Sequence, residues 1–292
     1  MKALALVPHS MHVEQTWKSL SCIGCEVIPY RYDLPGHHAN LISLTETMHP
    51  DFIVYFGGVE NGPSPELFCQ LRDLAPTILI AGDASDPPWY PLLNEYHAKD
   101  SFAVMVNVDG NFDTPIADFG LVLLMPQDPD QCGTLVPWDE RTRYCTFVGN
   151  TTVQDTPRSH ILQEMQARGA INLFGPFSSL PFETMMLIMT GSKVTFNTSS
   201  MGPRGETFNV KGRVVEAAAA GCCLLEQRNS HTAYWFEAGR DYLDYDSVGE
   251  ACNILAANIF SAEMAERFRA KWLAEHHPKV FWDTVLTRAG VR

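Results

Sequence analysis

The chain has 292 residues, of which 46% are hydrophobic and 19% are charged, which is enough apolar content for two sizeable cores. Its 34 acidic residues against 21 basic ones give a net charge of −13, which argues against nucleic acid or an anionic membrane as the principal partner. No apolar run is long enough for a membrane span or a signal peptide, so we expect a cytoplasmic protein without a transmembrane segment.

The first half of the chain alternates short apolar runs with amphipathic stretches. The amphipathic stretches at 13–21 and 64–74 predict helices, and the alternation is typical of a doubly wound parallel sheet. Neither a phosphate-loop pattern nor a dinucleotide-binding glycine pattern occurs, so we expect this domain, residues 1–138, to hold an acceptor rather than a cofactor. The predicted strands are 3–7, 26–30, 52–56, 77–81, 103–107 and 121–124.

Polar side chains follow several of these strands and would gather at one edge of the sheet. Asp83 and Asp86 follow the fourth strand, and His12 follows the first. These three residues are the candidates for a general base, if the reaction at this edge needs one to deprotonate an acceptor. The alternatives are that the two aspartates only cap the next helix or turn, and that His12 is an ordinary turn histidine.

A polar stretch rich in proline and aspartate at 127–143 predicts a linker, and we place the domain boundary after residue 138. The second domain, residues 139–262, continues the alternation of strands and helices. A strand is predicted at 144–149, an amphipathic helix at 158–168 and a further strand at 171–174.

The stretch 193–226 carries the most informative pattern in the chain. It predicts a strand at 194–196, a polar loop that contains Ser199, a glycine/proline break, an alanine-rich helix over 213–220 and a buried strand at 222–225. Ligands of α/β proteins bind beyond the carboxyl ends of the strands and at helix N-termini. We therefore expect the polar loop and the start of this helix to hold ligand.

Cations and one carboxylate surround the start of this helix. Lys211 and Arg213, with Arg204 in the preceding break, would neutralise a diphosphate, and Glu216 would accept hydrogen bonds from ribose hydroxyls. This combination suits a sugar nucleotide. The alternative is that Arg213 and Glu216 pair with each other on the surface of a purely structural helix.

The second half of the chain resembles a known family. The pattern R-x-x-E-x-x-A-x-G at 213–221, with Trp-Phe-Glu-Ala-Gly at 235–239 and Tyr-Asp-Ser at 245–247, resembles GT-B glycosyltransferases, especially the spore-maturation (CgeB-like) group. The similarity extends to Thr-Phe-Val-Gly-Asn at 146–150, with an arginine at 158, and to Asn-Leu-Phe-Gly at 172–175.

This resemblance implies an α/β fold of two Rossmann-like doubly wound domains that face a cleft, with the nucleotide sugar bound by the second domain. It implies that Gly149, with Asn150 and Arg158, faces the diphosphate of the donor, and that Phe174 and Gly175 lie near the base. The donor is expected to be UDP-linked, and neither a metal nor a bound cofactor is expected. Taken alone, both glycines are also consistent with ordinary turns.

One departure from the family concerns stereochemistry. Many retaining relatives carry two glutamates about two helical turns apart. Here Phe208 occupies the position of the first glutamate, and Glu206 is displaced from it by two residues. Retention and inversion therefore both stay open.

Residues 263–292 have helical spacing broken near Pro278, and we expect these last helices to return to the first domain. His231 follows the strand at 222–225 and is a candidate donor contact. We predict a metal-independent glycosyltransferase that moves a sugar from a nucleoside diphosphate to a hydroxyl of a glycan, a protein or a small molecule. The alternatives are a nucleotide-sugar epimerase of the same fold and a non-catalytic protein that binds a sugar or a nucleotide.

Overall fold

A computed structural model describes residues 1–8, 16–57, 62–82, 90–114, 116, 120–151, 156–175, 180–201, 205 and 207–292. The chain divides into two compact units, Met1–Asp128 with His276–Arg292, and the intervening Pro129–Glu275. The sequence-based boundaries after residues 138 and 262 differ from this division. The 3-10 segments η4 (Pro129–Cys132) and η5 (Trp138–Glu140) belong to the second unit.

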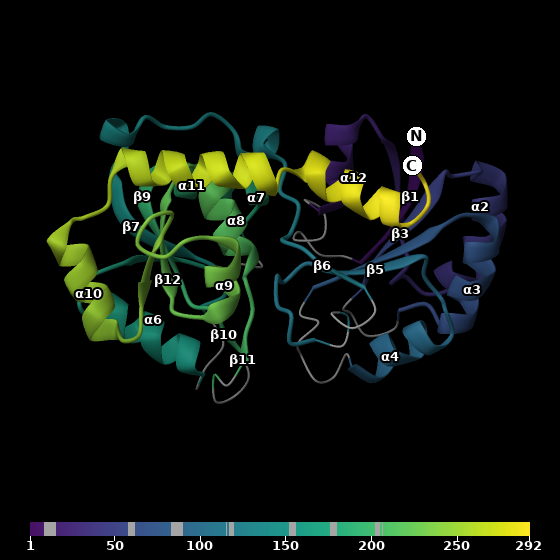
Figure 1. The fold of residues 1–292 in the computed structure, drawn as a ribbon, viewed down its shortest axis with the longest axis horizontal. Helices are drawn as coiled ribbons and strands as arrows, with labels where there is room; N and C mark the ends of the chain where they lie inside the picture. Colours follow the sequence, from purple (N-terminus) through teal and green to yellow (C-terminus); the bar gives the residue numbers. More distant parts are fainter. Residues whose placement is uncertain are drawn as a thin grey trace. The chain divides into compact units, whose positions relative to one another are not determined.

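The first unit contains a six-stranded parallel sheet. The chain starts with β1, adds β2 on one side of it as the edge strand and then continues with β3 on the other side (Figure 1). This reversal is the doubly wound topology that the alternating pattern predicts. In spatial order the strands are β2 (Glu26–Arg31), β1 (Lys2–Val7), β3 (Phe52–Gly57), β4 (Thr77–Ala81), β5 (Val104–Asn107) and β6 (Leu121–Val122).

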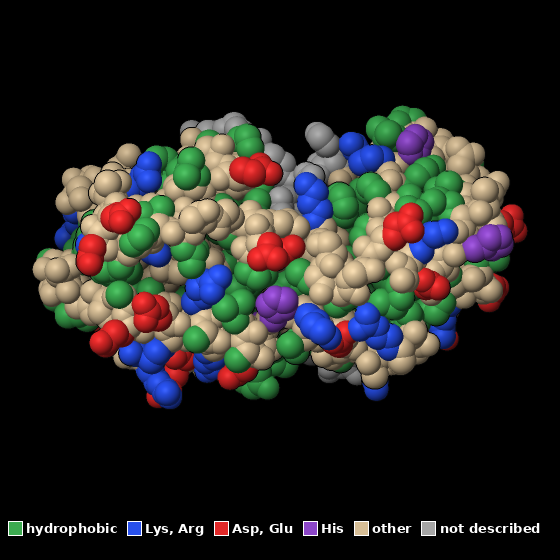
Figure 2. Space-filling model, turned by 90° about the horizontal axis from the view of Figure 1, so that it is seen from above, with side chains coloured by type: hydrophobic (Ala, Val, Ile, Leu, Met, Phe, Trp, Pro, Cys, Tyr) green, Lys and Arg blue, Asp and Glu red, His purple; other side chains and the backbone are tan. Residues whose placement is uncertain are grey.

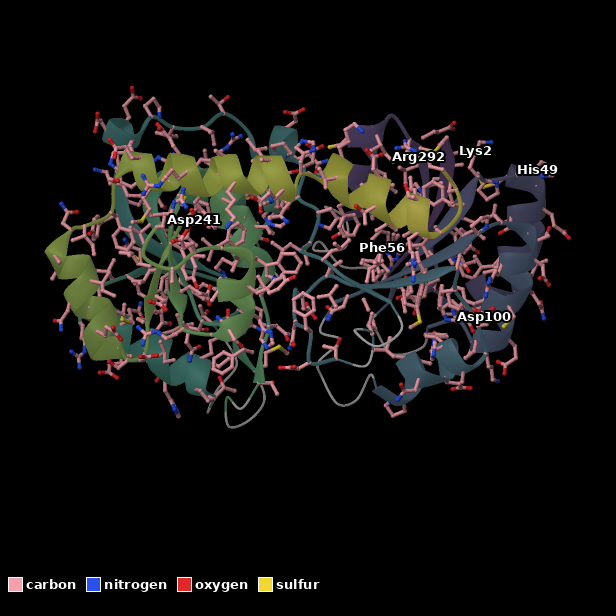
Figure 3. All side chains as sticks on the ribbon, in the orientation of Figure 1. Lys2, His49, Phe56, Asp100, Asp241 and Arg292 are labelled. Atoms are coloured by element: carbon pink, nitrogen blue, oxygen red, sulfur yellow. The ribbon has the colours of Figure 1, made fainter. Side chains whose placement is uncertain are left out.

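Both faces of the first sheet are buried, because successive residues of its strands pack into two different cores. One core contains Leu4, Tyr55 and Phe68 and is covered by helices α2, α3 and α4. The other contains Ala5 and Phe56 (Figure 3) and is covered by the last helix and η1. The helical segments are η1 (Ser19–Ile23), η2 (His37–Asn40), α2 (Leu41–Met48), α3 (Pro65–Leu74), α4 (Tyr90–Ala98) and α12 (Pro278–Arg288).

The last helix, α12, belongs to the core of the first unit. Trp282 is fully buried there, and its indole nitrogen donates a hydrogen bond of 2.8 Å to the hydroxyl of Ser19 in η1. The chain thus returns to the first sheet after the second unit is complete. The preceding helix, α11 (Ala262–Glu275), packs on α8 and β12 of the second unit, so the expected tail from residue 263 is split between the two units.

The second unit contains a five-stranded parallel sheet and a short antiparallel pair. In spatial order the strands are β13 (Leu243–Tyr245), β12 (Cys223–Gln227), β9 (Ser192–Asn197), β7 (Arg143–Val148) and β8 (Asn172–Phe174), and the pair is β10 (Ser200–Met201) with β11 (Thr207–Phe208). The helices are α6 (Pro157–Ala167), α7 (Phe182–Thr190), α8 (Gly212–Ala219), α9 (Ser230–Trp235) and α10 (Val248–Ala257), besides α11.

Alternation along β9 and β12 separates an apolar core from polar positions. Phe196 and Leu225 belong to a core that also contains residues of α6 and α10. Their neighbours Asn197 and Glu226 are fully buried as well, although both are polar. A buried polar pair at the ends of two adjacent strands needs partners, and the candidate site supplies them.

Three further features concern the cysteines, the helices and the surface. All eight cysteines are free thiols. Among the described residues, no helix is both long and apolar enough to cross a membrane. On the face shown in Figure 2, acidic, basic and hydrophobic side chains are interspersed, without an extended field of one charge sign.

Candidate functional site

The candidate site lies at the carboxyl edge of the second sheet. Its strands pair in parallel, so the ends of β7, β9 and β12 lie at the same edge. The strand order reverses at β7, because β8 lies on one side of it and β9 on the other. Chain segments that leave such a reversal in opposite directions leave room for a ligand. Val148 ends β7 and Asn197 ends β9, so these two residues mark the reversal point.

Arg213, near the start of α8, bridges these two strand ends. Its Nε donates a hydrogen bond of 2.6 Å to the carbonyl oxygen of Val148, and its Nη1 donates one to Oδ1 of Asn197. The guanidinium carbon lies 4.3 Å from the centroid of the Phe147 ring, a cation–π contact. Among the described residues, no other group accepts from the guanidinium, so its remaining N–H groups are available to an anion.

The charge of Arg213 is maintained despite its half-buried position. Burial lowers the pKa of Arg213 to about 10, while the charge of Glu216 acts in the opposite direction. A pKa of about 10 leaves the guanidinium protonated at neutral pH. The charge of Arg158, near the start of α6, also lowers this pKa, so two cations act on the same region. A bound anion would offset their mutual repulsion.

Two glycines make this close packing possible. A Cβ atom at Gly149 would overlap the guanidinium of Arg213, and one at Gly175 would overlap the carbonyl oxygen of Gly149. The N–H of Gly149 donates a hydrogen bond of 3.1 Å to the carbonyl oxygen of Phe174. Neither glycine has a positive φ, so close approach of the backbone, rather than a turn, explains both. The structure thus brings Gly149, Gly175 and Arg213 together.

Glu216 lies one turn after Arg213 on α8 and is only 7% exposed. Burial raises the pKa of its carboxyl group, and the charge of Arg213 opposes this shift. Among the described residues, no side chain donates a hydrogen bond to this carboxylate, and its attraction to Arg213 is the interaction that the structure shows. A surface ion pair, the alternative considered from the sequence, does not fit a buried glutamate whose neighbouring arginine bonds elsewhere.

The N-terminus of α8 lies next to these groups. Lys211 is its N-cap residue, and its side chain makes no capping hydrogen bond. A helix start without a side-chain cap presents N–H groups and the positive end of the helix dipole. Together with the two arginines, this end of α8 provides the positive charge and the hydrogen-bond donors that a diphosphate requires.

A buried carboxylate that the sequence did not single out completes the site. Glu226, near the end of β12, is fully buried. Its Oε2 accepts a hydrogen bond of 2.7 Å from Nδ2 of Asn197, and its Oε1 accepts one from the hydroxyl of Ser199. Burial raises the pKa of Glu226 to about 7, against the hydrogen bonds and the charge of Arg213, which lower it. A glutamate at the end of an apolar strand looks like a solvent-exposed residue in the sequence.

The remaining predicted residues fall into two groups. Ser199 is fully buried and donates to Glu226, so the structure shows an internal partner for it. The half-buried Phe174 ring lies 5.8 Å from the guanidinium carbon of Arg143. Asn150 is exposed directly after Gly149, and His231 is half-buried in α9. His12, Asp83, Asp86 and Arg204 lie outside the described residues, as does Glu206.

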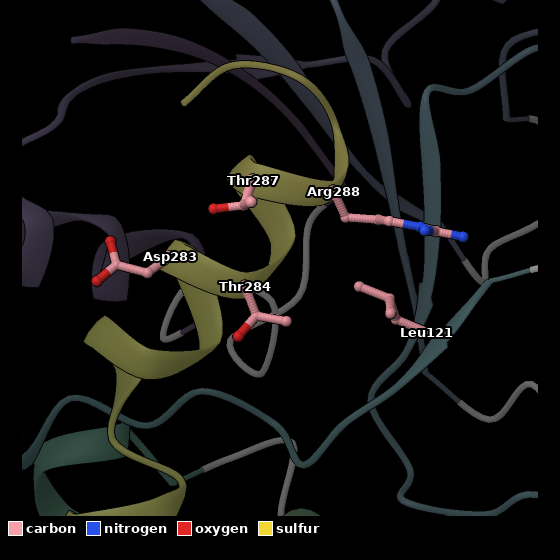
Figure 4. A pocket seen from close by; sticks show the side chains of 5 residues that line it. All are labelled: Leu121, Asp283, Thr284, Thr287 and Arg288. Atoms are coloured by element: carbon pink, nitrogen blue, oxygen red, sulfur yellow. The ribbon is translucent and has the colours of Figure 1, made fainter.

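Two other features were considered as sites. A pocket of the first unit is lined by Leu121 of β6 and by residues of α12 (Figure 4), but its charged side chains Asp283 and Arg288 both lie on α12. Asp283 forms ion pairs with Lys279 and Arg292 there. In the described part of the chain, no group of three or more His, Cys, Asp or Glu residues could hold a metal ion. Among the described residues, Arg213 and its neighbours therefore form the best candidate for a site that binds an anion.

Comparison with known proteins agrees with this geometry. Residues 158–287 match the family model described as "Glycosyl transferase-like". This segment contains α8, the strands β9 and β12, and all of α6 except its first residue. No curated protein matches the chain by sequence.

Several solved structures share the fold over the whole chain. Anabaena Alr3699/HepE in complex with UDP-glucose is 11% identical, with 100% of both chains covered and a TM-score of 0.65. AviGT4, a glycosyltransferase involved in avilamycin A biosynthesis, is 14% identical over 99% of this chain and 97% of that chain, with a TM-score of 0.62. An alpha-glucosyltransferase in complex with UDP and a 13-mer DNA is 8% identical over 99% of both chains, with a TM-score of 0.65.

At these identities the structural likeness concerns the fold, and the family match concerns residues 158–287. Two doubly wound α/β units, the likeness to glycosyltransferase structures over the full length and the family match over 158–287 agree with one another. The chain has the α/β fold of GT-B glycosyltransferase structures, and its residues 158–287 match a glycosyltransferase-like family model.

Proposed function

We propose that this protein transfers a sugar from a UDP-linked donor to an acceptor hydroxyl. The observation that carries the proposal is Arg213, a charged guanidinium held at the strand-order reversal with N–H groups left for an anion. Departure of the diphosphate requires neutralisation of the charge that develops on it, and a fixed cation in a partly dry site supplies this. The choice of UDP is supported by neighbours solved with UDP or UDP-glucose.

Other residues of the second unit would share the donor. Arg158, Lys211 and Arg204 would add positive charge around the diphosphate, and Gly149 would let it approach the backbone, as the sequence analysis expects. Glu216 would accept hydrogen bonds from the ribose, because its buried carboxylate is not hydrogen-bonded to a described side chain. Contacts of Asn150, Ser199, His231, Phe174 and Gly175 with the donor remain predictions.

The acceptor side remains a proposal from the sequence. Asp83, Asp86 or His12 would deprotonate the acceptor hydroxyl if the sugar is inverted. With Phe208 at the position of the first glutamate of retaining relatives, the stereochemical outcome stays open. A net charge of −13 favours a glycan, a protein or a small molecule over nucleic acid as the acceptor.

Three finer assignments are also proposals. Membership of the CgeB-like group rests on the pattern at 213–221 and the segments that follow it. Catalysis without a metal rests on the arginines and the start of α8, which supply the positive charge that a divalent ion supplies in other enzymes. A cytoplasmic location remains a prediction.

Donor binding can be tested directly by thermal unfolding. UDP at about 100 times its dissociation constant should stabilise the protein by roughly 2.7 kcal/mol, because a ligand bound only by the native state shifts the unfolding equilibrium. The rise in Tm should be the same with and without EDTA. A shift that appears only with a divalent cation would contradict metal-independent binding, and no shift with any nucleoside diphosphate would contradict the proposed donor class.

Glu216→Gln tests the ribose contact. The variant keeps the shape and an acceptor oxygen but loses the charge, so UDP binding should weaken by roughly 1.5–3 kcal/mol, mostly as a higher KM for the donor. Isothermal titration calorimetry with UDP measures this loss, and 2′,3′-dideoxy-UDP serves as the matched ligand. The dideoxy ligand should bind the wild type and the variant almost equally. A similar loss for both ligands would exclude the ribose contact.

Turnover separates catalysis from binding alone. A screen of nucleotide sugars for release of the nucleoside diphosphate in the presence of acceptors would detect transfer. An epimerase of the same fold would convert the sugar, and a non-catalytic protein would bind the donor without consuming it.

A further inference from the structure

The link between Glu226 and Arg213 passes through a single side-chain amide. Asn197 accepts a hydrogen bond from Nη1 of Arg213 at its Oδ1 and donates one of 2.7 Å from its Nδ2 to Glu226. The same Nδ2 lies 3.3 Å from the hydroxyl oxygen of Ser199, which itself donates to Glu226. Asn197 and Glu226 are both fully buried, so water does not compete for these bonds.

The chemistry of the two end groups allows one orientation of this amide. A guanidinium only donates hydrogen bonds, so it must meet the amide oxygen, and this leaves the amide nitrogen to donate to Oε2 of Glu226, an oxygen that can accept whether or not the other carboxyl oxygen carries a proton. If the amide turned over, its NH2 group would face the guanidinium of Arg213 and its oxygen would face the carboxylate of Glu226. Both bonds would be lost in a buried site, which costs far more than one exposed hydrogen bond.

The backbone around Asn197 is also held in place. The hydroxyl of Tyr245, at the end of β13, donates a hydrogen bond of 2.9 Å to the carbonyl oxygen of Asn197. The Tyr245 ring stacks on Phe196, with 5.0 Å between the ring centroids. With the backbone fixed by β13, rotation of the amide itself is the remaining freedom, and Glu226 removes it.

We propose that Glu226 is a positioning residue for the donor site, which orients the Asn197 amide and thereby holds the guanidinium of Arg213 in the geometry that binds the diphosphate. This inference rests on the proposed function, since it concerns the same anion. It assigns a role to a carboxyl group that is fully buried and accepts hydrogen bonds from Asn197 and Ser199. Arg213 is then held from two sides, by Val148 through Nε and by Glu226 through Asn197.

A double-mutant cycle tests this role. Glu226→Met removes the acceptor while keeping a long unbranched side chain, and it should weaken UDP binding about tenfold in the wild-type background. In the Arg213→Ala background the same change should have little effect, because the group that it positions is absent. The affinity is measured from the rise in Tm with UDP at concentrations up to the millimolar range, so that weak binding by Arg213→Ala is still detected.

Two further variants separate orientation from charge and from folding. Glu226→Gln can still accept from Asn197 and should bind UDP within about threefold of the wild type. Asp241→Leu removes another buried carboxylate of the same unit (Figure 3), which accepts from the backbone N–H of Glu237 and pairs with Lys271, and this change should leave UDP affinity unchanged. If Glu226→Met fails to fold, Asn197→Ala breaks the same link and should give the same loss, again only when Arg213 is present.

The outcomes are distinct. If wild-type protein fails to bind UDP or any other nucleoside diphosphate, the proposed function is wrong and the positioning role is wrong with it. If the wild type binds but Glu226→Met binds equally well, or loses the same affinity with and without Arg213, only the positioning role is overturned. A loss in Glu226→Gln as large as that in Glu226→Met would show that charge, rather than amide orientation, is what Glu226 provides.

Discussion

Replacement of Arg213 by alanine is expected to lower kcat/KM for the sugar nucleotide by roughly two to three orders of magnitude, with a large part of the loss in kcat. The guanidinium is charged, is fixed by Val148 and Asn197, and keeps N–H groups for a ligand anion. Charge on the leaving diphosphate increases as the glycosidic bond breaks, so a fixed cation stabilises the transition state more than the ground state.

Arg213 also holds two strand ends together, so a structural effect must be separated from a catalytic one. Uridine is the matched ligand, because it carries the ribose and the base without the diphosphate. Arg213→Ala should weaken UDP binding strongly and leave uridine binding nearly unchanged. Arg213→Lys keeps a charge but cannot bond to both strand ends, so its activity should lie between wild type and alanine. Equal losses for UDP and uridine would indicate a collapsed site and remove Arg213 from diphosphate binding.

The parts of the fold that could be predicted from the sequence are those with strong local signals. Buried parallel strands are nearly continuous apolar runs, and those at 52–56 and 77–81 appear as β3 and β4 with almost the same bounds. The alanine-rich helix at 213–220 appears as α8, one residue earlier. Short elements escaped prediction because their form depends on tertiary partners. The pair β10 with β11 has two residues in each strand, and β13 has three.

The candidate site was predictable only where its residues are close in sequence. Arg213 and Glu216 stand out because they lie one turn apart at the start of a predicted helix. The partners in the site come from far along the chain. Val148, which bonds to Arg213, is 65 residues away from it, and Asn197, which bonds to Glu226, is 29 residues away from that glutamate. No local pattern shows that a glutamate after an apolar strand is buried, because its burial is created by Asn197 and Ser199 on a neighbouring strand and loop.

Burying the carboxylate of Glu226 costs free energy, and this cost is why fully buried carboxylates are unusual. Burying an ionised group removes its hydration, and hydrogen bonds and a nearby cation return only part of that free energy. At Glu226 burial outweighs both hydrogen bonds and the attraction of Arg213, because its pKa is raised to about 7 in spite of them. A group kept at this cost is more easily explained by what it positions than by what it adds to stability.

This cost predicts a pH dependence of stability that can be measured on Glu226→Gln. In the folded protein burial raises the pKa of Glu226 to about 7, whereas the ordinary pKa of a glutamate is 4.5. Between these values folding takes up a proton, so the stability that Glu226 contributes is fully present below pH 4.5 and is lost as the pH rises through 7. Glutamine does not titrate, so the free energy of unfolding of Glu226→Gln relative to wild type should rise by about 3 kcal/mol across this window.

Urea unfolding of both proteins at intervals between pH 4.5 and 8 measures this difference, and comparison at each pH cancels the titration of every other group. Glu66→Gln is the control, because Glu66 is exposed and the hydrogen bond from Lys99 lowers the pKa of its carboxyl group. Because this pKa is lowered from 4.5, the effect of Glu66 on stability changes below pH 4.5 and has the opposite sign, so its difference from wild type should stay nearly flat between pH 4.5 and 8. A difference between Glu226→Gln and wild type that stays flat across the window would show that Glu226 is ionised throughout it. The Asn197 amide would then meet a full carboxylate even in mild acid, and its hold on Arg213 would not change with pH.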